Sequence, residues 1–159
     1  MLIFKMANYK RIFLDGYSYY LTIVTHQRNP ILIENIELLR ESFRVSKKKY
    51  QYKIEAIVIL PDHIHLIITP KIAKEYPHII RTIKQYFSKH CEEHYFTHLE
   101  QSTSRWKEGY RTVWQKKYYE HTIRNEKDFL EKITYMQNNP LKHGLVEDIK
   151  EWKYSSFFK

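Results

Sequence analysis

Four segments of the chain carry the β-branched and aromatic residues that favour strands. The first follows Gly16, and the second and third are separated only by Pro61 and Asp62, a pair typical of a turn. So short a break predicts an antiparallel hairpin between these two strands. The predicted strands are Tyr17–Thr25, Tyr52–Leu60, His63–Thr69 and Val113–Ile123.

Between and after these strands, apolar residues recur at the spacing of amphipathic helices. The first predicted helix ends in a basic run, and the second begins at a proline that suits a first turn. Asn125 is a suitable N-cap for the third, and Pro140 is expected to stop it. Residues 97–112 show little periodicity and predict a loop. The predicted helices are Ile36–Lys49, Pro77–His94 and Glu126–Asn138.

The order of these elements is strand, helix, strand, strand, helix, strand, helix. Hairpin-joined strands with interspersed helices predict an α+β fold, a ferredoxin-like antiparallel sheet with helices on one face and a further C-terminal helix that carries Tyr135. The aromatic tail, with Trp152, Tyr154, Phe157 and Phe158, is expected to pack back on the body. A chain of 159 residues can bury one full core, so we expect a single domain over residues 1–159.

Composition narrows the class of protein. With 43% hydrophobic and 16% aromatic residues, the chain has too much apolar mass for a disordered protein. Its longest apolar runs, such as residues 57–60, are far shorter than the roughly 18 residues of a membrane span. Cys91 is the single cysteine, which rules out an intramolecular disulfide and a multi-cysteine zinc site.

The charge balance points to nucleic acid. Lysine and arginine outnumber acidic residues by 27 to 18, a net charge of +9, and the sequence pI is about 9.4. Basic side chains near phosphates release condensed counterions, and interleaved aromatic rings can stack on unpaired bases. A merely basic surface is the alternative explanation. The candidate DNA contacts are Lys47, Lys48, Lys49, Lys84, Arg105, Arg111, Lys116 and Lys117.

Two histidines form the first candidate site. His63 and His65 are two residues apart on a predicted strand, so both imidazoles project from the same face. Such a pair can occupy two positions around a divalent ion and leave the others to a third ligand and to substrate oxygens. Two surface histidines on an edge strand are the alternative, but free imidazoles are poorly accommodated in so apolar a strand.

A tyrosine and an asparagine form the second candidate site. Tyr135 and Asn139 are four residues apart near the end of the last predicted helix, and therefore share one face. A phenol can attack a phosphodiester and form a covalent phosphotyrosine, and an amide oxygen one turn later could complete a metal site. The alternative is a core tyrosine followed by an Asn–Pro helix stop. Of the fourteen tyrosines, only Tyr135 has Asn or Gln at the fourth position after it.

Because it contains both the histidine pair and the tyrosine–asparagine pair, the sequence resembles the HUH-type single-tyrosine transposases. Within that family it resembles most the REP-associated tyrosine transposases, which are relatives of small bacterial insertion-sequence enzymes. Ile64 supplies the apolar residue between the two histidines. Insertion-sequence relatives carry glutamine where Asn139 stands, whereas the REP-associated branch tolerates asparagine. The resemblance is carried by Leu60–Leu66 (LPDHIHL), Val113–Arg124 (VWQKKYYEHTIR), Tyr135–Val146 (YMQNNPLKHGLV) and Trp152–Phe157 (WKYSSF).

The resemblance implies a role for each candidate residue. His63, His65 and Asn139 would bind Mg²⁺ or Mn²⁺, and Tyr135 would attack single-stranded DNA beside a hairpin to leave a 5′-phosphotyrosine. It also implies a bacterial, cytoplasmic protein associated with the nucleoid, with no membrane partner; a homodimer is left open. A hairpin-binding protein without strand transfer and an RNA-binding module are the alternatives, and the complete tyrosine-and-histidine set argues against both.

Overall fold

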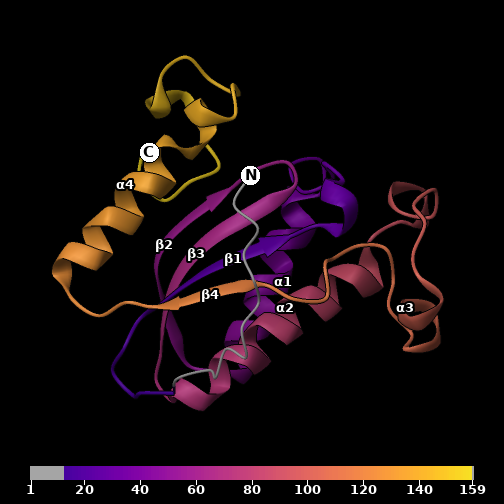
Figure 1. Ribbon diagram of the computed structural model, residues 1–159, viewed down its shortest axis with the longest axis horizontal. Helices are drawn as coiled ribbons and strands as arrows, with labels where there is room; N and C mark the ends of the chain where they lie inside the picture. Colours follow the sequence, from indigo (N-terminus) through magenta and orange to yellow (C-terminus); the bar gives the residue numbers. More distant parts are fainter. Residues whose placement is uncertain (1–12, 159) are drawn as a thin grey trace.

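The computed structural model describes residues 13–158, whose core is an antiparallel sheet of four strands. The strands lie in the order β2-β3-β1-β4, which together with the chain order of strands and helices is a ferredoxin-like topology (Figure 1). The predicted α+β fold is therefore confirmed. The strands are β1 (Tyr19–Val24), β2 (Tyr52–Ile59), β3 (His63–Pro70) and β4 (Tyr119–Thr122), and the helices are α1 (Ile36–Lys49), α2 (Tyr76–His90), α3 (Thr103–Lys107) and α4 (Glu126–Lys142).

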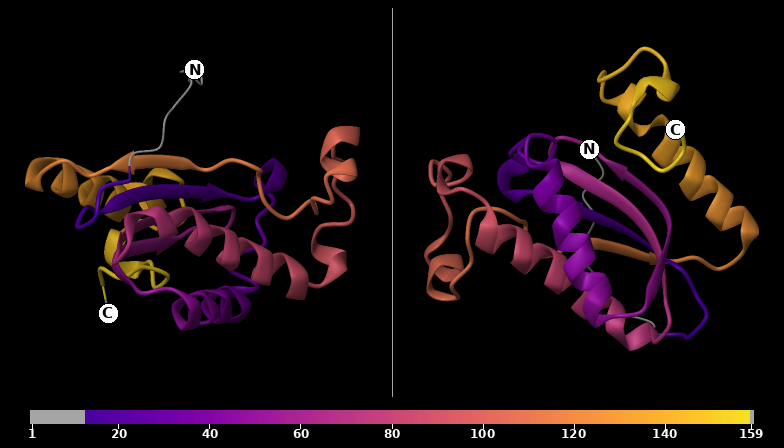
Figure 2. Two further views of the ribbon diagram at one scale, coloured as in Figure 1. Left: turned by 90° about the horizontal axis from the view of Figure 1, so that it is seen from below. Right: turned by 180° about the vertical axis from the view of Figure 1, so that it is seen from behind.

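Helices cover both faces of the sheet. α1 and α2 pack side by side across one face, seen from behind in Figure 2. They bury the larger apolar cluster, which includes Leu21, Leu66 and Phe87. α4 lies against the opposite face over a smaller cluster around Ile67 and Met136. The division follows from the two-residue period of a strand, which sends alternate side chains to opposite faces.

The predicted hairpin is present, and so is the predicted α1. β2 and β3 pair antiparallel, with a register shift between Ile54 and Ala56 that marks a bulge. α1 begins and ends at the residues that the sequence predicts. The tail returns to the body as predicted, because Ser155 bridges to Val58 on the free edge of β2 and Trp152 and Phe157 pack on the smaller cluster.

Several predicted boundaries differ from the structure. β4 is shorter than the predicted strand over residues 113–123, because the register with β1 shifts by two residues between the Thr22–Tyr119 pair and the isolated Thr25–Trp114 bridge, which interrupts the ladder. α2 ends at His90 rather than His94, where a separate turn of 3₁₀ helix follows. The predicted loop at residues 97–112 contains the short helix α3.

Pro140 does not stop α4. The helix runs through it to Lys142, at the cost of one backbone hydrogen bond close to the helix end. The stop comes from Gly144, whose left-handed φ of 68° allows its N–H to reach the Leu141 carbonyl while the Leu145 N–H reaches Pro140. This closure is a Schellman motif. Asn125 caps the other end as predicted, accepting a hydrogen bond from the Asp128 N–H at 2.9 Å.

Candidate active site

β3 presents its two histidines toward α4. His63 lies opposite Val24 and His65 opposite Thr22 in the β1–β3 register, and both imidazoles are 4% exposed. Their ring centroids are 4.8 Å apart and the rings are nearly perpendicular. Ile64, between them, points to the α1–α2 face and is fully buried. The predicted shared face is therefore present, in the interior of the sheet and not at an edge.

The His63 imidazole has a polar neighbour at each of its two nitrogens. Nδ1 lies 2.6 Å from Asp62 Oδ1, and Nε2 lies 3.2 Å from Asn139 Oδ1. Partial burial by itself would raise the pKa of the Asp62 carboxyl, but its bonds to His63 and Arg28 hold that pKa below its usual value. An ionised carboxylate on Nδ1 fixes this nitrogen as the protonated one, which leaves the Nε2 lone pair facing Asn139.

The His65 imidazole is positioned by hydroxyls. Its Nδ1 lies 2.8 Å from the Tyr20 hydroxyl and 3.0 Å from Thr22 Oγ1. Burial lowers the pKa of His65 to about 3, with a smaller contribution from the neighbouring His63, so the ring is neutral near pH 7. Its Nε2 is buried and has no hydrogen-bond partner within residues 13–158.

α4 brings the tyrosine and the amide to these imidazoles. Asn139 is 1% exposed and Tyr135, one turn earlier, is 43% exposed. The Tyr135 ring centroid is 5.4 Å from that of His65, in an edge-to-face arrangement. The predicted pairs therefore meet, with the amide inside the site and the phenol at its opening.

Three atoms converge in a way that suits a divalent ion. They are Nε2 of His63, Nε2 of His65 and Oδ1 of Asn139, and the His65 nitrogen is a buried orphan within the described chain. Neutral imidazole nitrogens and an amide oxygen are good ligands for such an ion, and Asp62 on His63 supplies the usual outer partner. Between Phe13 and Phe158, no group of three His, Cys, Asp or Glu side chains could serve instead. The residues present fit a metal.

Three of the predicted DNA contacts lie around one groove, which neither of the two histidines lines. The groove has a volume of about 550 Å³ between α2 and residues 108–118. Arg111 and Lys116 line it, and Lys116 pairs with Glu108 at 2.7 Å. Lys84 is turned inward: its Nζ donates to the Gln115 carbonyl at 2.8 Å, and burial lowers its pKa to about 8.

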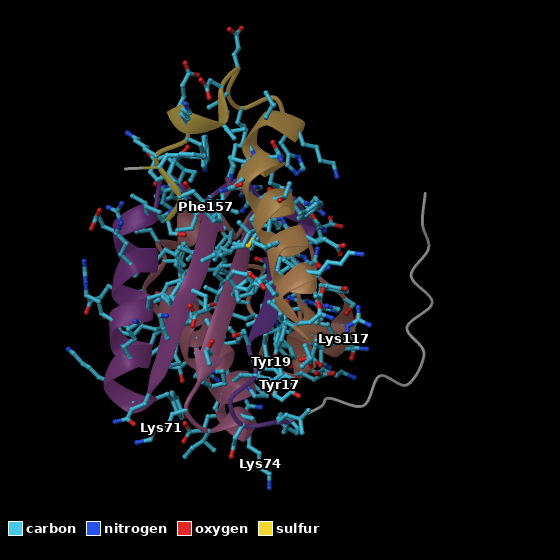
Figure 3. The ribbon with its side chains drawn as sticks, turned by 90° about the vertical axis from the view of Figure 1, so that its left-hand side faces the viewer. Tyr17, Tyr19, Lys71, Lys74, Lys117 and Phe157 are labelled. Carbon is cyan, nitrogen blue, oxygen red and sulfur yellow. The ribbon has the colours of Figure 1, made fainter. Side chains whose placement is uncertain are left out.

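The other predicted contacts are dispersed. Arg105 donates to the carbonyls of Arg111 and Trp114, and so braces the segment beside the groove. Residues 47–49 are exposed at the end of α1. Lys117 is exposed just before β4 and is labelled in Figure 3. The structure thus unites one part of the basic set and leaves the rest apart.

Several residues at the site escaped the sequence analysis. Tyr20 and Thr22 alternate with apolar residues on β1, a period that marks them as facing the histidines once the β1–β3 register is known. Arg28 and His143 reach the site from loops that follow β1 and α4. Asp62 was recognised only as a turn residue. His121, on β4, is held by the Asp128 carboxylate at 2.8 Å.

Comparisons with known proteins agree with this geometry. Residues 14–139 match the family described as "Transposase IS200 like". A Haemophilus influenzae protein assigned to the REP-associated tyrosine transposases is 34% identical over 160 residues, covering 97% of this chain and 87% of the relative. The REP-associated tyrosine transposase of Escherichia coli K12 is 29% identical, covering 97% and 84%.

The fold comparison points the same way. A solved structure of a REP-associated tyrosine transposase bound to a REP hairpin superposes with a TM-score of 0.79 and 28% identity. The match covers 96% of this chain and 83% of that one. In the part of the chain that the structure describes, no helix is long and apolar enough to cross a bilayer.

Proposed function

The chain belongs to the IS200-like transposases, and among them to the REP-associated tyrosine transposases, and we propose that it cleaves and rejoins single-stranded DNA beside a hairpin. The observation that carries the proposal is the meeting of Tyr135 with the imidazole of His65, 5.4 Å apart between ring centroids. The half-exposed phenol of Tyr135 can reach a phosphodiester that is bound beside His63, His65 and Asn139.

In the proposed mechanism, His63, His65 and Asn139 hold Mg²⁺ or Mn²⁺. Such an ion, when bound, polarises the scissile phosphate and neutralises the charge that develops on it. Asp62 keeps His63 in the tautomer that leaves Nε2 unprotonated. The hydroxyls of Tyr20 and Thr22 accept a hydrogen bond from His65 Nδ1–H. This keeps His65, too, in the tautomer whose Nε2 is unprotonated.

Tyr135 is the nucleophile of this proposal. Its phenolic oxygen forms a bond to phosphorus while the bond from phosphorus to the 3′-oxygen breaks, which leaves a 5′-phosphotyrosine and a free 3′-hydroxyl. The phenolic proton passes to solvent, and the departing oxygen takes one from solvent. Attack by another 3′-hydroxyl reverses the step and rejoins strands without an external energy source.

The basic groove beside α2 is the proposed seat of the hairpin's paired stem. Its lining comes from residues 77–89 and 108–118, whereas the two histidines lie on β3. Log affinity for hairpin DNA is therefore expected to fall steeply with log salt, with a slope of several phosphate contacts. A flat salt response contradicts the nucleic-acid function as a whole.

The proposed function also bears on the cellular location of the protein. Action on chromosomal hairpins requires a cytoplasmic, nucleoid-associated protein. The homodimer left open by the sequence stays a prediction, which the mass in solution tests.

The decisive experiment is capture of the covalent intermediate. Labelled hairpin DNA with single-stranded flanks is incubated with the protein and Mg²⁺ or Mn²⁺, and a protein-linked adduct is sought on a denaturing gel. We expect the adduct with the wild type and none with Tyr135→Phe, which keeps the ring and removes the hydroxyl.

Tyr119→Phe is the matched control. Tyr119 is 47% exposed on β4, against 43% for Tyr135, and its ring lies 6.1 Å from that of Tyr20. We expect Tyr119→Phe to form the adduct. Loss of the adduct in Tyr119→Phe with retention in Tyr135→Phe means that the catalytic helix is wrongly assigned. Hairpin binding without any adduct in the wild type supports the non-cleaving alternative.

A further inference from the structure

We propose that Arg28 and Lys142 bind backbone phosphates of the single-stranded segment that enters the site, one on the His63 side and the other on the Tyr135 side. This inference rests on the proposed function and adds a binding site for the substrate strand. Neither residue belongs to the groove beside α2 or to the three converging ligand atoms. Both are exposed.

Arg28 is carried by a strained turn. Gln27 and Arg28, in the 3₁₀ turn His26–Arg28 that follows β1, have φ values of 51° and 52°, so two successive non-glycine residues are left-handed. Such backbone costs energy, persists only when its surroundings impose it, and is concentrated at functional sites. Here the turn is tied to the segment before β3: Thr25 donates from its N–H and its hydroxyl to the Asp62 carbonyl, at 2.9 and 3.0 Å.

The turn directs the Arg28 guanidinium to the edge of the site. Nη1 lies 3.3 Å from Asp62 Oδ2, and the other carboxylate oxygen of Asp62 holds His63. The Arg28 side chain remains 60% exposed. A guanidinium has five N–H donors, so a single long contact to Asp62 leaves donors for a phosphate beside His63.

Lys142 lies across the site from this turn, in the last turn of α4. Its Nζ is 5.3 Å from the centroid of the Tyr135 ring, seven residues earlier on the same helix face. From Phe13 to Phe158, no carboxylate lies within ion-pair distance of Lys142. An unneutralised cation beside the proposed nucleophile is suited to a phosphate that approaches Tyr135.

His143 shows that the two charges act on one place. Its ring centroid is 5.1 Å from that of His63, Lys142 precedes it directly in the chain, and Arg28 contacts Asp62 on the other side of His63. The opening of the site is therefore positive on two sides, which suits a polyanion that crosses it.

The test separates this role from the simpler one in which Arg28 only supports Asp62. An oligothymidylate of about 15 nucleotides, which forms no hairpin, is titrated by fluorescence anisotropy with EDTA present, over about 50 to 200 mM NaCl. The variants are Arg28→Gln, Lys142→Met and the double substitution. Lys74→Met is the control for loss of one exposed positive charge, because Lys74 lies beyond the other end of β3, at the end of the molecule opposite the tail (Figure 3).

Each lost phosphate contact on a single strand lowers the log–log salt slope by about 0.7, which is about a fivefold loss of affinity at 0.1 M salt. We expect that loss for Arg28→Gln and for Lys142→Met, about twice the slope change for the double variant, and none for Lys74→Met. Lys116→Met, in the groove, is expected to affect hairpin binding more than oligothymidylate binding.

Wild-type oligothymidylate affinity in both single variants overturns the proposal. So does an Arg28→Gln variant whose one defect is weaker Mn²⁺ binding, because Arg28 then acts through Asp62. An equal loss in Lys74→Met also overturns it, since the effect is then one of net charge. If the wild type forms the phosphotyrosine adduct but the variants bind oligothymidylate normally, the inference fails and the proposed function stands. If the wild type forms no adduct but the variants bind oligothymidylate more weakly, the proposed function fails and the strand-binding site stands.

Discussion

β3 separates two faces that bury side chains equally well but are built differently. Toward α1 and α2 it presents Ile64, Leu66 and Ile68, all fully buried in the larger apolar cluster. Toward α4 it presents His63 and His65, which are 4% exposed. The first face is held by packing, and the second by hydrogen bonds that direct each imidazole.

The face of β3 toward α4 contains buried polar atoms without hydrogen-bond partners, and their free-energy cost points to a functional role. Each histidine uses Nδ1 for a partner on its own sheet or turn, and turns Nε2 toward α4. Within the described chain, His65 Nε2 and Asn139 Nδ2 are buried without a hydrogen-bond partner. A purely structural face would not leave such atoms, because each costs about 1–3 kcal/mol. Stability and function are therefore assigned to opposite sides of one strand.

The largest expected effect is on the polar face. His63→Ala removes a proposed metal ligand and should reduce adduct formation by about 100- to 1000-fold, the scale seen when a charge-stabilising group is removed from an active site. Hairpin binding should remain, because the basic groove lies elsewhere. Adduct yield and hairpin affinity are measured on the same preparation. Undiminished cleavage, or cleavage that survives excess chelator, would remove the metal from the mechanism.

A substitution on the apolar face should give the opposite result. Leu66→Ala, the neighbour of His65, leaves a cavity under α1 and α2 and should lower the free energy of unfolding by about 3 kcal/mol. Urea denaturation measures the loss. The folded fraction should still form the adduct, since no atom of Leu66 faces the site; a specific loss of chemistry with unchanged stability would break the division between the faces.

The sequence predicts this division better than it predicts how the site is completed. Alternation along β3 places the histidines on one face, and four-residue spacing places Tyr135 and Asn139 on one face of α4, so the meeting of the two pairs follows from local periods. The α+β fold is likewise predicted from local periods of apolar residues, and it is confirmed.

What sequence reasoning missed depends on the register between strands and on the shapes of turns. Tyr20 and Thr22 reach His65 only because β1 pairs with β3 in a particular register. Arg28 reaches Asp62 only through two left-handed residues that no propensity favours. Pro140 does not end α4, because a proline near the C-terminus of a helix removes only a single hydrogen bond.

A smaller effect is expected one step away from the ligands. Asp62→Asn keeps the shape of the side chain but replaces a carboxylate by an amide on His63 Nδ1, and should weaken Mn²⁺ affinity by about 10- to 100-fold. Isothermal titration measures the affinity directly. Cleavage should return at high Mn²⁺ concentration, whereas His63→Ala should stay inactive; equal affinities of Asp62→Asn and the wild type would show that Asp62 does not orient the ligand.

The smallest expected effect concerns the anchor of α4 to the sheet. The buried Asp128 carboxylate contacts His121 on β4 and accepts from the Arg124 N–H at 3.0 Å. Burial opposes ionisation, but these bonds outweigh it and lower the pKa of Asp128 below its usual 3.8. The stabilisation is therefore complete above the unfolded pKa near 4 and is lost as the pH falls through the lower folded pKa. Asp128→Asn should cost about 1–2 kcal/mol at pH 7 and progressively less below pH 4, measured by urea denaturation at several pH values. A constant difference down to pH 2 would mean that the charge of Asp128 does not hold the helix that carries Tyr135.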